Sequence, residues 1–355
     1  MNDFLALVQS MGAENIRLMN DFSETIHPKL VRTSGILAVD VASGIGGFPR
    51  DRMIEVFGWE GSGKTTLMLI KCAVETQLKK YVQFIDVEHA LDVEYAKALG
   101  VDMNYFALSQ PNSAEEAGDI MLKAARTKGC STVVLDSIAQ LETEQAIAGD
   151  LNDANIGTAA RFMKALCLKL PGICSVHKTL IMFTNQNREK PGVMFGNPVY
   201  QPGGKAVKFA CSMRIELHKK STNKENDKAI SNTTRVKFIK NKLGMPYQEG
   251  EFDIIFGVGA DNAKSTLNLG TECKVLTKKG SSYYFNGDSL GNGIKKAKAT
   301  LEGDKNLYNG IRRAILKASL GKEVIPAKNE EVPRTEAITP PAETVGPLRS
   351  VLWDT

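Results

Sequence analysis

The chain has 355 residues, of which 43% are hydrophobic and 24% charged, and its formal net charge is +5. These values are ordinary for a globular protein, and they exclude a mostly disordered, collagen-like or coiled-coil chain. No apolar run approaches the roughly 18–20 residues that span a membrane, and we find neither a secretory signal nor an Arg-rich transit peptide.

The first predicted element is a short helix over residues 3–11, because Phe4, Leu7, Val8 and Met11 recur at helical spacing. So short a helix cannot bury its apolar face alone. We therefore expect residues 1–30 to form a helix and linker that docks on its own chain or on a neighbouring copy.

Short apolar runs then alternate with helical patterns from about residue 31 to 262. The predicted strands cover 53–58, 81–86, 131–136 and 179–186, and helical periods cover 65–80 and 114–129. This alternation predicts an α/β fold with a mostly parallel central sheet flanked by helices. Later runs without long helices between them should extend the sheet as antiparallel strands, at 213–220, 233–242 and 249–257.

The carboxyl-terminal part divides into two segments. Residues 263–325 are rich in Lys, with a predicted hairpin at 274–290 and a predicted helix at 307–319, which indicates a small α+β unit. Five prolines interrupt residues 326–355, so we predict a disordered tail there.

The strongest chemical signal is a phosphate loop. Residues 58–65 fit G-x-x-x-x-G-K-[ST], follow a predicted strand and open a predicted helix. The glycines let backbone N–H groups wrap phosphates, and the helix amino terminus adds a favourable dipole. In such loops the lysine reaches the β- and γ-phosphates and the following hydroxyl binds Mg²⁺. The predicted nucleotide-binding residues are Gly58, Trp59, Glu60, Gly61, Ser62, Gly63, Lys64, Thr65 and Thr66.

Acidic residues at two strand ends complete this site. Asp136 ends the apolar run 132–135, the position of the second group that holds Mg²⁺ in phosphate-loop enzymes. Asp86 and Glu88 follow the run 81–85, at the end of a strand where open α/β sheets bind their ligands. We choose Glu88 as the general base that activates water, although an acid in a solvated loop would look the same in the sequence.

The sequence favours adenine over guanine. Residues 241–244 resemble the guanine-reading pattern N-K-x-D but lack its Asp, and nothing else in the chain would read guanine. Tyr95 is placed to stack on an adenine, although an ordinary half-buried aromatic explains it equally well.

Seven segments occur in the order and spacing of the bacterial RecA recombinases, namely GWEGSGKTT, FIDVEHALD, VVLDS, GTAARFMKAL, FTNQNREKPGVMFGNP, GGKAVKFACSMR and TRVKFIKNK. The chain resembles this family over about residues 31–300, and FIDVEHALD and VMFGNP are more specific than a phosphate loop alone. The resemblance implies a RecA-fold ATPase that polymerises on single-stranded DNA, pairs it with homologous duplex DNA and exchanges strands in recombination and repair.

The resemblance also implies roles for single residues. Glu88 corresponds to the catalytic glutamate, Asp136 to the second Mg²⁺ residue and Tyr95 to the aromatic beside the adenine, and Asp92 joins the ATP-binding set. Gln186 corresponds to the glutamine that senses the γ-phosphate and begins the second DNA-binding loop.

Two lysines near the end of the predicted sheet gain a role in the same way. Lys240 and Lys242 share a predicted strand face with Val236 and Phe238, and on residues alone we would interpret them as solvated lysines. In the family the matching lysines reach the ATP bound by the adjacent protomer. Hydrolysis would then depend on assembly, with the lysines acting in trans.

Two polar segments that contain Gly or Pro, 148–157 and 187–203, match the DNA-binding loops of the family, although on residues alone they would be mobile surface loops. Arginines neutralise phosphates, glycines let backbone N–H groups approach them, and apolar side chains wedge between bases. The predicted DNA-binding residues are Ile156, Arg161, Arg188, Val193, Met194, Phe195, Gly196, Asn197, Gly203 and Gly204. A basic run at 295–298 is either a duplex-binding patch or a solvated face.

Two other functions remain open. A ring-forming helicase or motor shares the phosphate loop but does not need residues 187–203. A non-enzymatic DNA-binding regulator would keep the fold without hydrolysis, and the intact Lys64, Glu88 and Gln186 argue against it. We expect ATP and Mg²⁺ as cofactors, and single-stranded DNA, double-stranded DNA and further copies of the chain as partners. The six cysteines lack metal-binding spacing, so we expect reduced thiols and a cytoplasmic protein without membrane contact.

Overall fold

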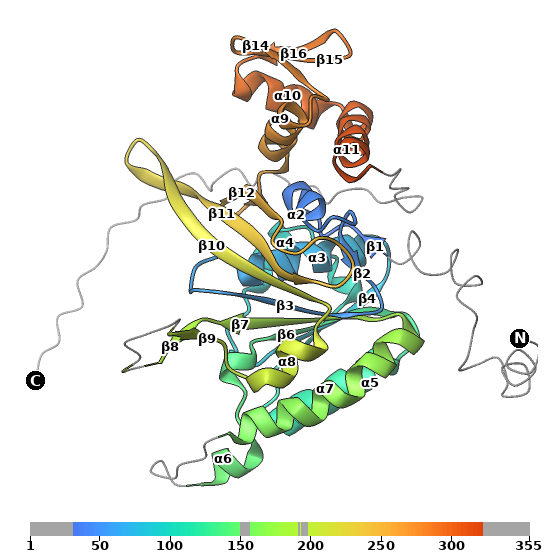
Figure 1. Cartoon of the computed structure of the whole chain (residues 1–355), viewed down its shortest axis with the longest axis vertical. Helices are drawn as coiled ribbons and strands as arrows, with labels where there is room; N and C mark the ends of the chain where they lie inside the picture. Colours follow the sequence, from blue (N-terminus) through green and yellow to red (C-terminus); the bar gives the residue numbers. More distant parts are fainter. Residues whose placement is uncertain (1–30, 150–156, 191, 193–197, 322–355) are drawn as a thin grey trace, which may run out of the picture.

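The computed structural model describes residues 31–149, 157–190, 192 and 198–321. The predicted helix at 3–11 and the predicted tail at 326–355 lie outside the described residues. The described part consists of a large α/β body and a smaller α+β unit at one end (Figure 1). None of the helices in the described ranges combines the length and apolar character that crossing a bilayer requires.

A nine-stranded sheet forms the centre of the larger body (Figure 1). Its strands, in spatial order, are β13 (Gly259–Ala260), β12 (Glu249–Ile255), β11 (Lys228–Asn241), β10 (Met213–Glu225), β3 (Met53–Gly58), β7 (Leu180–Gln186), β6 (Cys130–Asp136), β4 (Tyr81–Asp86) and β5 (Phe106–Ser109). Neighbours from β10 to β5 are parallel, and those from β10 to β13 are antiparallel. The predicted α/β fold with a mostly parallel sheet is confirmed.

Helices cover both faces of this sheet (Figure 1). On one face lie α3 (Lys64–Gln77) and α4 (Val93–Ala98), and on the other lie α5 (Ala114–Arg126), α7 (Thr158–His177) and α8 (Gly204–Ala210). Successive strand residues enter different cores, since Phe84 packs in one buried cluster and Ile85 in the other. Burial on both faces explains why the strands read as continuous apolar runs.

Short elements connect the layers. They are β1 (Val31–Arg32), α2 (Leu37–Ala42), β2 (Phe48–Pro49), η3 (Met103–Tyr105), η4 (Ile138–Gln140), α6 (Glu144–Ala148), β8 (Arg188–Glu189) and β9 (Val199–Tyr200). The β8 and β9 strands pair with each other outside the large sheet.

Two features of the body differ from the prediction. The strand predicted at 213–220 is antiparallel to β11 but parallel to β3, because the chain returns through α8 before it enters β10.

The sequence pattern also does not predict α7, whose helical period is obscured by Pro171. The helix nevertheless runs 20 residues through that proline, although a proline inside a helix removes one backbone hydrogen bond.

The smaller unit contains α9 (Asn262–Glu272), β14 (Thr277–Lys279), β15 (Ser282–Phe285), β16 (Asp288–Asn292), α10 (Ile294–Gly303) and α11 (Lys305–Leu320). Its three strands form an antiparallel sheet, where the sequence predicts one hairpin. The additional strand follows a tight turn at Asn286 and Gly287, which both have positive φ, as two-residue hairpin turns require. The α+β character is as predicted, whereas the domain boundaries stay a prediction.

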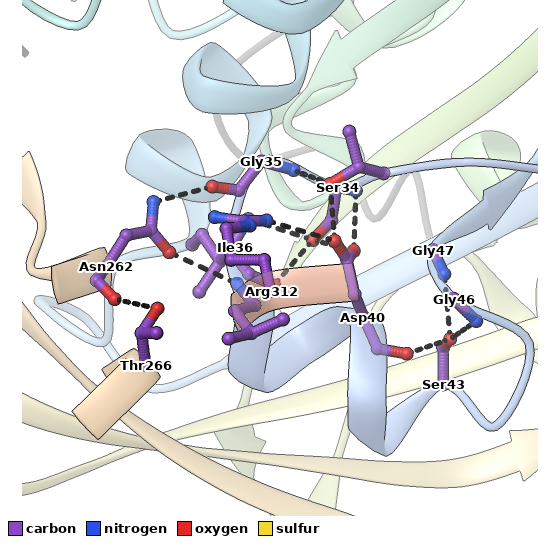
Figure 2. A network of polar contacts seen from close by, with 12 residues as sticks. Ser34, Gly35, Ile36, Asp40, Ser43, Gly46, Gly47, Asn262, Thr266 and Arg312 are labelled. Atoms are coloured by element: carbon purple, nitrogen blue, oxygen red, sulfur yellow. Dashed lines mark hydrogen bonds and ion pairs between the residues drawn. The ribbon is translucent and has the colours of Figure 1, made fainter. Parts of the chain in front are cut away.

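A buried polar network joins this unit to the body (Figure 2). Asp40 on α2 is fully buried and accepts hydrogen bonds from the backbone N–H (2.7 Å) and hydroxyl (2.6 Å) of Ser34. Arg312 on α11 lies 3.9 Å from the same carboxylate, and Asn262 donates to the carbonyl of Gly35 at 2.7 Å. Burial raises the pKa of Asp40, while Arg312 and the hydrogen bonds oppose that rise. Charge and hydrogen bonds together therefore fix α9 and α11 against the body.

Candidate nucleotide and DNA site

The phosphate loop connects β3 to α3 at the edge where the parallel strands end. Its backbone turns through positive φ at Gly61 (67°) and Gly63 (90°), a region that side chains rarely adopt. A Cβ at Gly63 would also collide with Ile254. Because no side chain in the described ranges caps the first turn of α3, its backbone N–H groups can bind an anion.

Lys64 lies across the mouth of this loop. Its Nζ donates to the carbonyl oxygens of Trp59 (2.9 Å) and Gly58 (3.3 Å). Burial lowers the pKa of Lys64, whereas the carboxylates of Asp136 and Glu88 act to raise it. These nearby carboxylates favour the cationic form, which is the form that binds phosphate.

Thr65 and Asp136, the two residues predicted to hold Mg²⁺, are in direct contact. The Thr65 hydroxyl donates to Asp136 Oδ2 at 2.7 Å, and the Thr184 hydroxyl donates to Asp136 Oδ1. Burial raises the pKa of Asp136, and these two hydrogen bonds oppose the rise. Among the described residues, no group of three or more His, Cys, Asp or Glu is arranged to hold a metal. One carboxylate and one hydroxyl fit Mg²⁺, which takes its other ligands from phosphates and water.

Glu88 and Gln186 lie together beside this pair. Glu88 Oε1 accepts a hydrogen bond from the Ser137 hydroxyl at 2.6 Å and from Gln186 Nε2 at 3.2 Å. Gln186 ends β7, where it pairs in register with Gly58 at the start of the phosphate loop. Glu88 thus lies next to the loop with its carboxylate held by two donors, and its role as general base stays a prediction.

The structure separates Asp86, the last residue of β4, from Glu88, which follows that strand. Asp86 is 3% exposed, and its Oδ2 accepts from the backbone N–H of Leu91 and from Gln110 Nε2, both at 3.0 Å. Asp86 therefore holds the following loop, while Glu88 contacts Gln186.

Tyr95 and Asp92 lie at the start of α4. The Tyr95 hydroxyl is 3.1 Å from the Thr66 hydroxyl, which places the tyrosine beside the first turn of α3. Burial raises the pKa of Tyr95, and its hydrogen bond to Thr66 opposes the rise. Asp92 accepts from the backbone N–H of Tyr95 at 3.0 Å as the N-cap of α4. The helix cap is thus a structural use of Asp92.

The second predicted DNA segment begins at the same edge, directly after Gln186 at the end of β7. Arg188 on β8 and Arg161 on α7 are exposed, and Arg188 donates to the carbonyl of Ala139 at 3.0 Å. Gly203 and Gly204 begin α8 with φ values of 86° and 75°. The other predicted DNA-binding residues lie outside the described residues, namely Ile156, Val193, Met194, Phe195, Gly196 and Asn197.

The strand face predicted for Lys240 and Lys242 is wrong. The pairing of β11 with β10 shifts register between Phe238 and Lys240, so the alternation that buries Val236 and Phe238 does not continue. Lys242 lies beyond the end of β11 and is exposed.

Both lysines also lie away from the phosphate loop of their own chain. Lys240 pairs with Arg214, which pairs with Glu55 of β3, whereas the loop begins at Gly58. Burial and the nearby charge of Lys242 lower the pKa of Lys240. The Lys240 ammonium donates to the end of α8 instead, at 2.6 Å from a backbone carbonyl oxygen.

Sequence reasoning missed residues that orient the site. Thr184 binds Asp136 and Ser137 binds Glu88, although neither is a predicted site residue. A signal existed for Thr184, because it and Asn185 are polar residues at fully buried positions of an apolar strand. Such residues are paired with other polar groups.

Known proteins resemble this chain over most of its length. The family model described as the RecA N-terminal domain matches residues 7–261, and the model described as the RecA C-terminal domain matches residues 256–320. "Protein RecA" of Nocardioides sp. is 40% identical over 338 residues, which cover 95% of this chain and 94% of the relative. "Protein RecA" of Oceanobacillus iheyensis is 40% identical over 86% of this chain and 88% of its own. "Protein RecA" of Caldanaerobacter subterraneus is 41% identical over 79% and 82%.

Proposed function

The chain belongs to the RecA family, and we propose that it binds ATP and Mg²⁺ between two of its copies, so that the γ-phosphate controls its grip on single-stranded DNA. Membership makes it a recombinase of recombination and repair and a DNA-dependent ATPase. We place this activity in the cytoplasm.

The observation that carries the proposal is the position of Glu88. Its carboxylate accepts from Ser137 and Gln186 and lies beside the Thr65–Asp136 pair. Glu88 takes a proton from the attacking water, while the Ser137 hydroxyl keeps the carboxylate oriented. A positioned general base of this kind contributes roughly 10²–10⁴-fold to a rate.

The neighbouring residues bind and orient the substrate. Lys64 exchanges its carbonyl partners for the β- and γ-phosphate oxygens, and the amino terminus of α3 donates backbone N–H groups to them. Thr65 and Asp136 hold the metal, and Thr184 fixes the Asp136 carboxylate. Mg²⁺ bound there would neutralise the charge that develops on the phosphate oxygens.

The position of Lys240 and Lys242 supports a site shared between copies. Neither lysine contacts its own phosphate loop within the described residues, and Lys240 lies level with Glu55 rather than with Gly58. We infer that both reach the γ-phosphate bound by a second copy. Such a head-to-tail contact uses two different surfaces, so it propagates into a helical filament when the rotation does not close.

Gln186 connects the nucleotide to DNA in this proposal. With ATP bound, its side chain turns from Glu88 to the γ-phosphate, and residues 187–203 follow because Gln186 is continuous with them. Arg161 and Arg188 neutralise DNA phosphates. Single-stranded DNA occupies the filament and duplex DNA pairs with it during strand exchange.

The experiment that tests this function compares ATP turnover with single-stranded DNA, with duplex DNA and without DNA, and images the product. We expect single-stranded DNA to stimulate turnover and to carry filaments, and Lys64→Ala to abolish turnover. Closed hexamers on DNA would favour the ring-forming motor instead. Wild-type turnover in Lys64→Ala would contradict the nucleotide site.

A further inference from the structure

A second polar network, away from the reacting atoms, surrounds Glu55. Glu55 lies in the middle of β3, three residues before the phosphate loop, and is fully buried. Its Oε2 accepts from Arg214 Nε at 2.5 Å, and its Oε1 accepts from Asn185 Nδ2 at 2.9 Å. The guanidinium of Arg214 also lies over the ring of Phe57, 4.6 Å from the centroid. Both carboxylate oxygens are thus committed to partners on neighbouring strands.

One arm of this network closes the base of the second DNA segment. Arg214 donates to Gln201 Oε1 at 3.1 Å, and Gln201 Nε2 donates to Asn187 Oδ1 at 2.9 Å. The strands β8 and β9 pair Arg188 with Tyr200, so Asn187 and Gln201 form the next rung below that pair. A side-chain hydrogen bond therefore joins the two ends of the segment where it leaves the large sheet.

The other arm reaches Gln186 itself. Asn185 Nδ2 donates to the carbonyl of Pro202 at 2.9 Å, and Asn185 Oδ1 accepts from the backbone N–H of Gln186 at 3.0 Å. The backbone N–H of Asn187 donates to the carbonyl of Gly58 at 3.2 Å. Both ends of the segment and the residue that senses nucleotide are consequently tied to Glu55 and to the first residue of the phosphate loop.

We propose that Gln201 is a positioning residue that transmits the nucleotide state of Gln186 to the DNA segment. We name the set Glu55, Asn185, Asn187, Gln201 and Arg214 the stem clamp. The inference rests on the proposed function, because it assumes that Gln186 responds to the γ-phosphate and that residues 187–203 contact DNA. Its new content is that the segment moves as one closed stem, held at its base by Gln201.

The physical reason is that a buried polar network in which every group has a hydrogen-bond partner allows few alternative arrangements. An apolar contact tolerates a small slide, whereas a buried network with every partner in place is rigid and favours one arrangement. A displacement of Gln186 must therefore move both ends of the stem together. Without Gln201 the returning end would lose its bonds to Arg214 and Asn187 and would keep only the Asn185–Pro202 bond and the β8–β9 pairing, so it would follow the displacement less closely.

The test substitutes Gln201, which is neutral and only partly buried, rather than the buried charges. Gln201→Leu removes both hydrogen bonds at similar volume. The readout is a ratio measured at fixed salt with a fluorescent single-stranded oligonucleotide. It is the dissociation constant with ADP divided by the dissociation constant with a slowly hydrolysed ATP analogue. Gln77→Leu is the matched control, because Gln77 also donates a 3.0 Å hydrogen bond, to the carbonyl of Gly100, but lies at the far end of α3.

We expect Gln201→Leu to reduce this ratio at least about fivefold, the lower end of usual coupling between sites. Gln77→Leu should leave the ratio unchanged. Gln201→Glu should restore the ratio, because a carboxylate still accepts from Arg214 and from the Asn187 amide after that amide rotates. Its added charge weakens DNA binding in both nucleotide states alike. Asn187→Ala should reduce the ratio without adding to the effect of Gln201→Leu, since Gln201→Leu already removes the Gln201–Asn187 hydrogen bond.

A folded Gln201→Leu variant with the wild-type ratio would overturn the inference while leaving the proposed function intact. Equal losses in Gln201→Leu and Gln77→Leu would also overturn it, because a general loss of stability would then explain both. A wild-type ratio of one would instead contradict the proposed function on which the inference rests.

Discussion

Gln186 Nε2 donates a 3.2 Å hydrogen bond to Glu88 Oε1, which links the end of β7 to the loop that follows β4. Ser137 follows β6, the strand between them, and its hydroxyl donates to the same oxygen. One carboxylate oxygen thus joins the ends of adjacent strands beside the phosphate loop. The residue proposed to sense the nucleotide and the residue proposed to activate water are therefore in direct contact.

Glu88→Gln should block hydrolysis and leave nucleotide binding intact. The amide keeps the shape of the side chain but cannot accept a proton, so we expect turnover to fall roughly 10²–10⁴-fold. Phosphate release measures turnover. Binding can be followed by the fluorescence of Trp59, which lies 42% exposed in the loop, in a Trp353→Phe background that removes the second tryptophan. Turnover at the wild-type rate would remove Glu88 from the role of base.

Thr184→Val should weaken activation by Mg²⁺ without abolishing it. The substitution removes the hydroxyl that donates to Asp136 and keeps the volume. Loss of a residue that hydrogen-bonds to a metal ligand typically lowers metal affinity 10–100-fold. The measurement is the Mg²⁺ concentration for half-maximal turnover. Thr132→Val is the control, because the buried Thr132 hydroxyl on the adjacent strand has no hydrogen-bond partner among the described residues. An identical Mg²⁺ response in both variants would refute the role of Thr184.

Glu75 makes the stability of the body depend on acidity. It is buried on α3, accepts from Lys71 Nζ at 2.7 Å and pairs with Arg32. Burial acts to raise its pKa, but the charges of Lys71 and Arg32 outweigh this and lower the pKa from 4.5 to about 2. The unfolded chain therefore binds the proton first as pH falls. The stabilisation, on the order of 3 kcal/mol, is present above pH 4.5 and lost as pH approaches 2.

Glu75→Gln should consequently flatten the fall in unfolding free energy between pH 4.5 and pH 2. It should also lower stability near pH 7 by about 3–5 kcal/mol, because buried Lys71 and Arg32 lose their partner. Urea unfolding across pH measures both effects. Glu94→Gln breaks an exposed ion pair on α4 and should change stability by less than about 1 kcal/mol. An unchanged pH profile in Glu75→Gln would show that this ion pair does not set the acid response.

Arg188→Ala should reduce the salt dependence of DNA binding. Each phosphate contact to single-stranded DNA contributes about 0.7 to the slope of log affinity against log salt, so the slope should become shallower by that amount. Arg126→Ala removes the same charge from the far end of α5 and should leave the slope unchanged. Equal slopes in all three proteins would place Arg188 away from the DNA.

The sequence could predict the nucleotide site because strand ends meet at one edge of a parallel sheet. Gly58, Glu88, Asp136 and Gln186 each lie at or just after an apolar run, and the structure gathers them there. The local sequence pattern does not show which of these side chains form hydrogen bonds with one another, since the Gln186–Glu88 hydrogen bond joins residues 98 positions apart.

The remaining misses have local physical causes. Pro171 obscured a helix that tertiary packing nevertheless maintains, because α7 buries one face against the sheet and against α5. The shift between Phe238 and Lys240 changed the side on which the following residues lie, and a single extra residue in a strand leaves little trace in the sequence. The stem clamp could not be predicted from the sequence, because Asn187 and Gln201 become neighbours only when β8 and β9 pair.

The most direct test of the account mixes two inactive variants on single-stranded DNA. Glu88→Gln keeps the lysines that act on a neighbour, and the double variant Lys240→Ala with Lys242→Ala keeps its own Glu88. If nucleotide lies between copies, an equal mixture should recover roughly a quarter of wild-type turnover. In a randomly ordered filament, one interface in four combines an intact Glu88 from the double variant with intact lysines from the Glu88→Gln variant. A mixture no more active than its separate components would contradict the shared site.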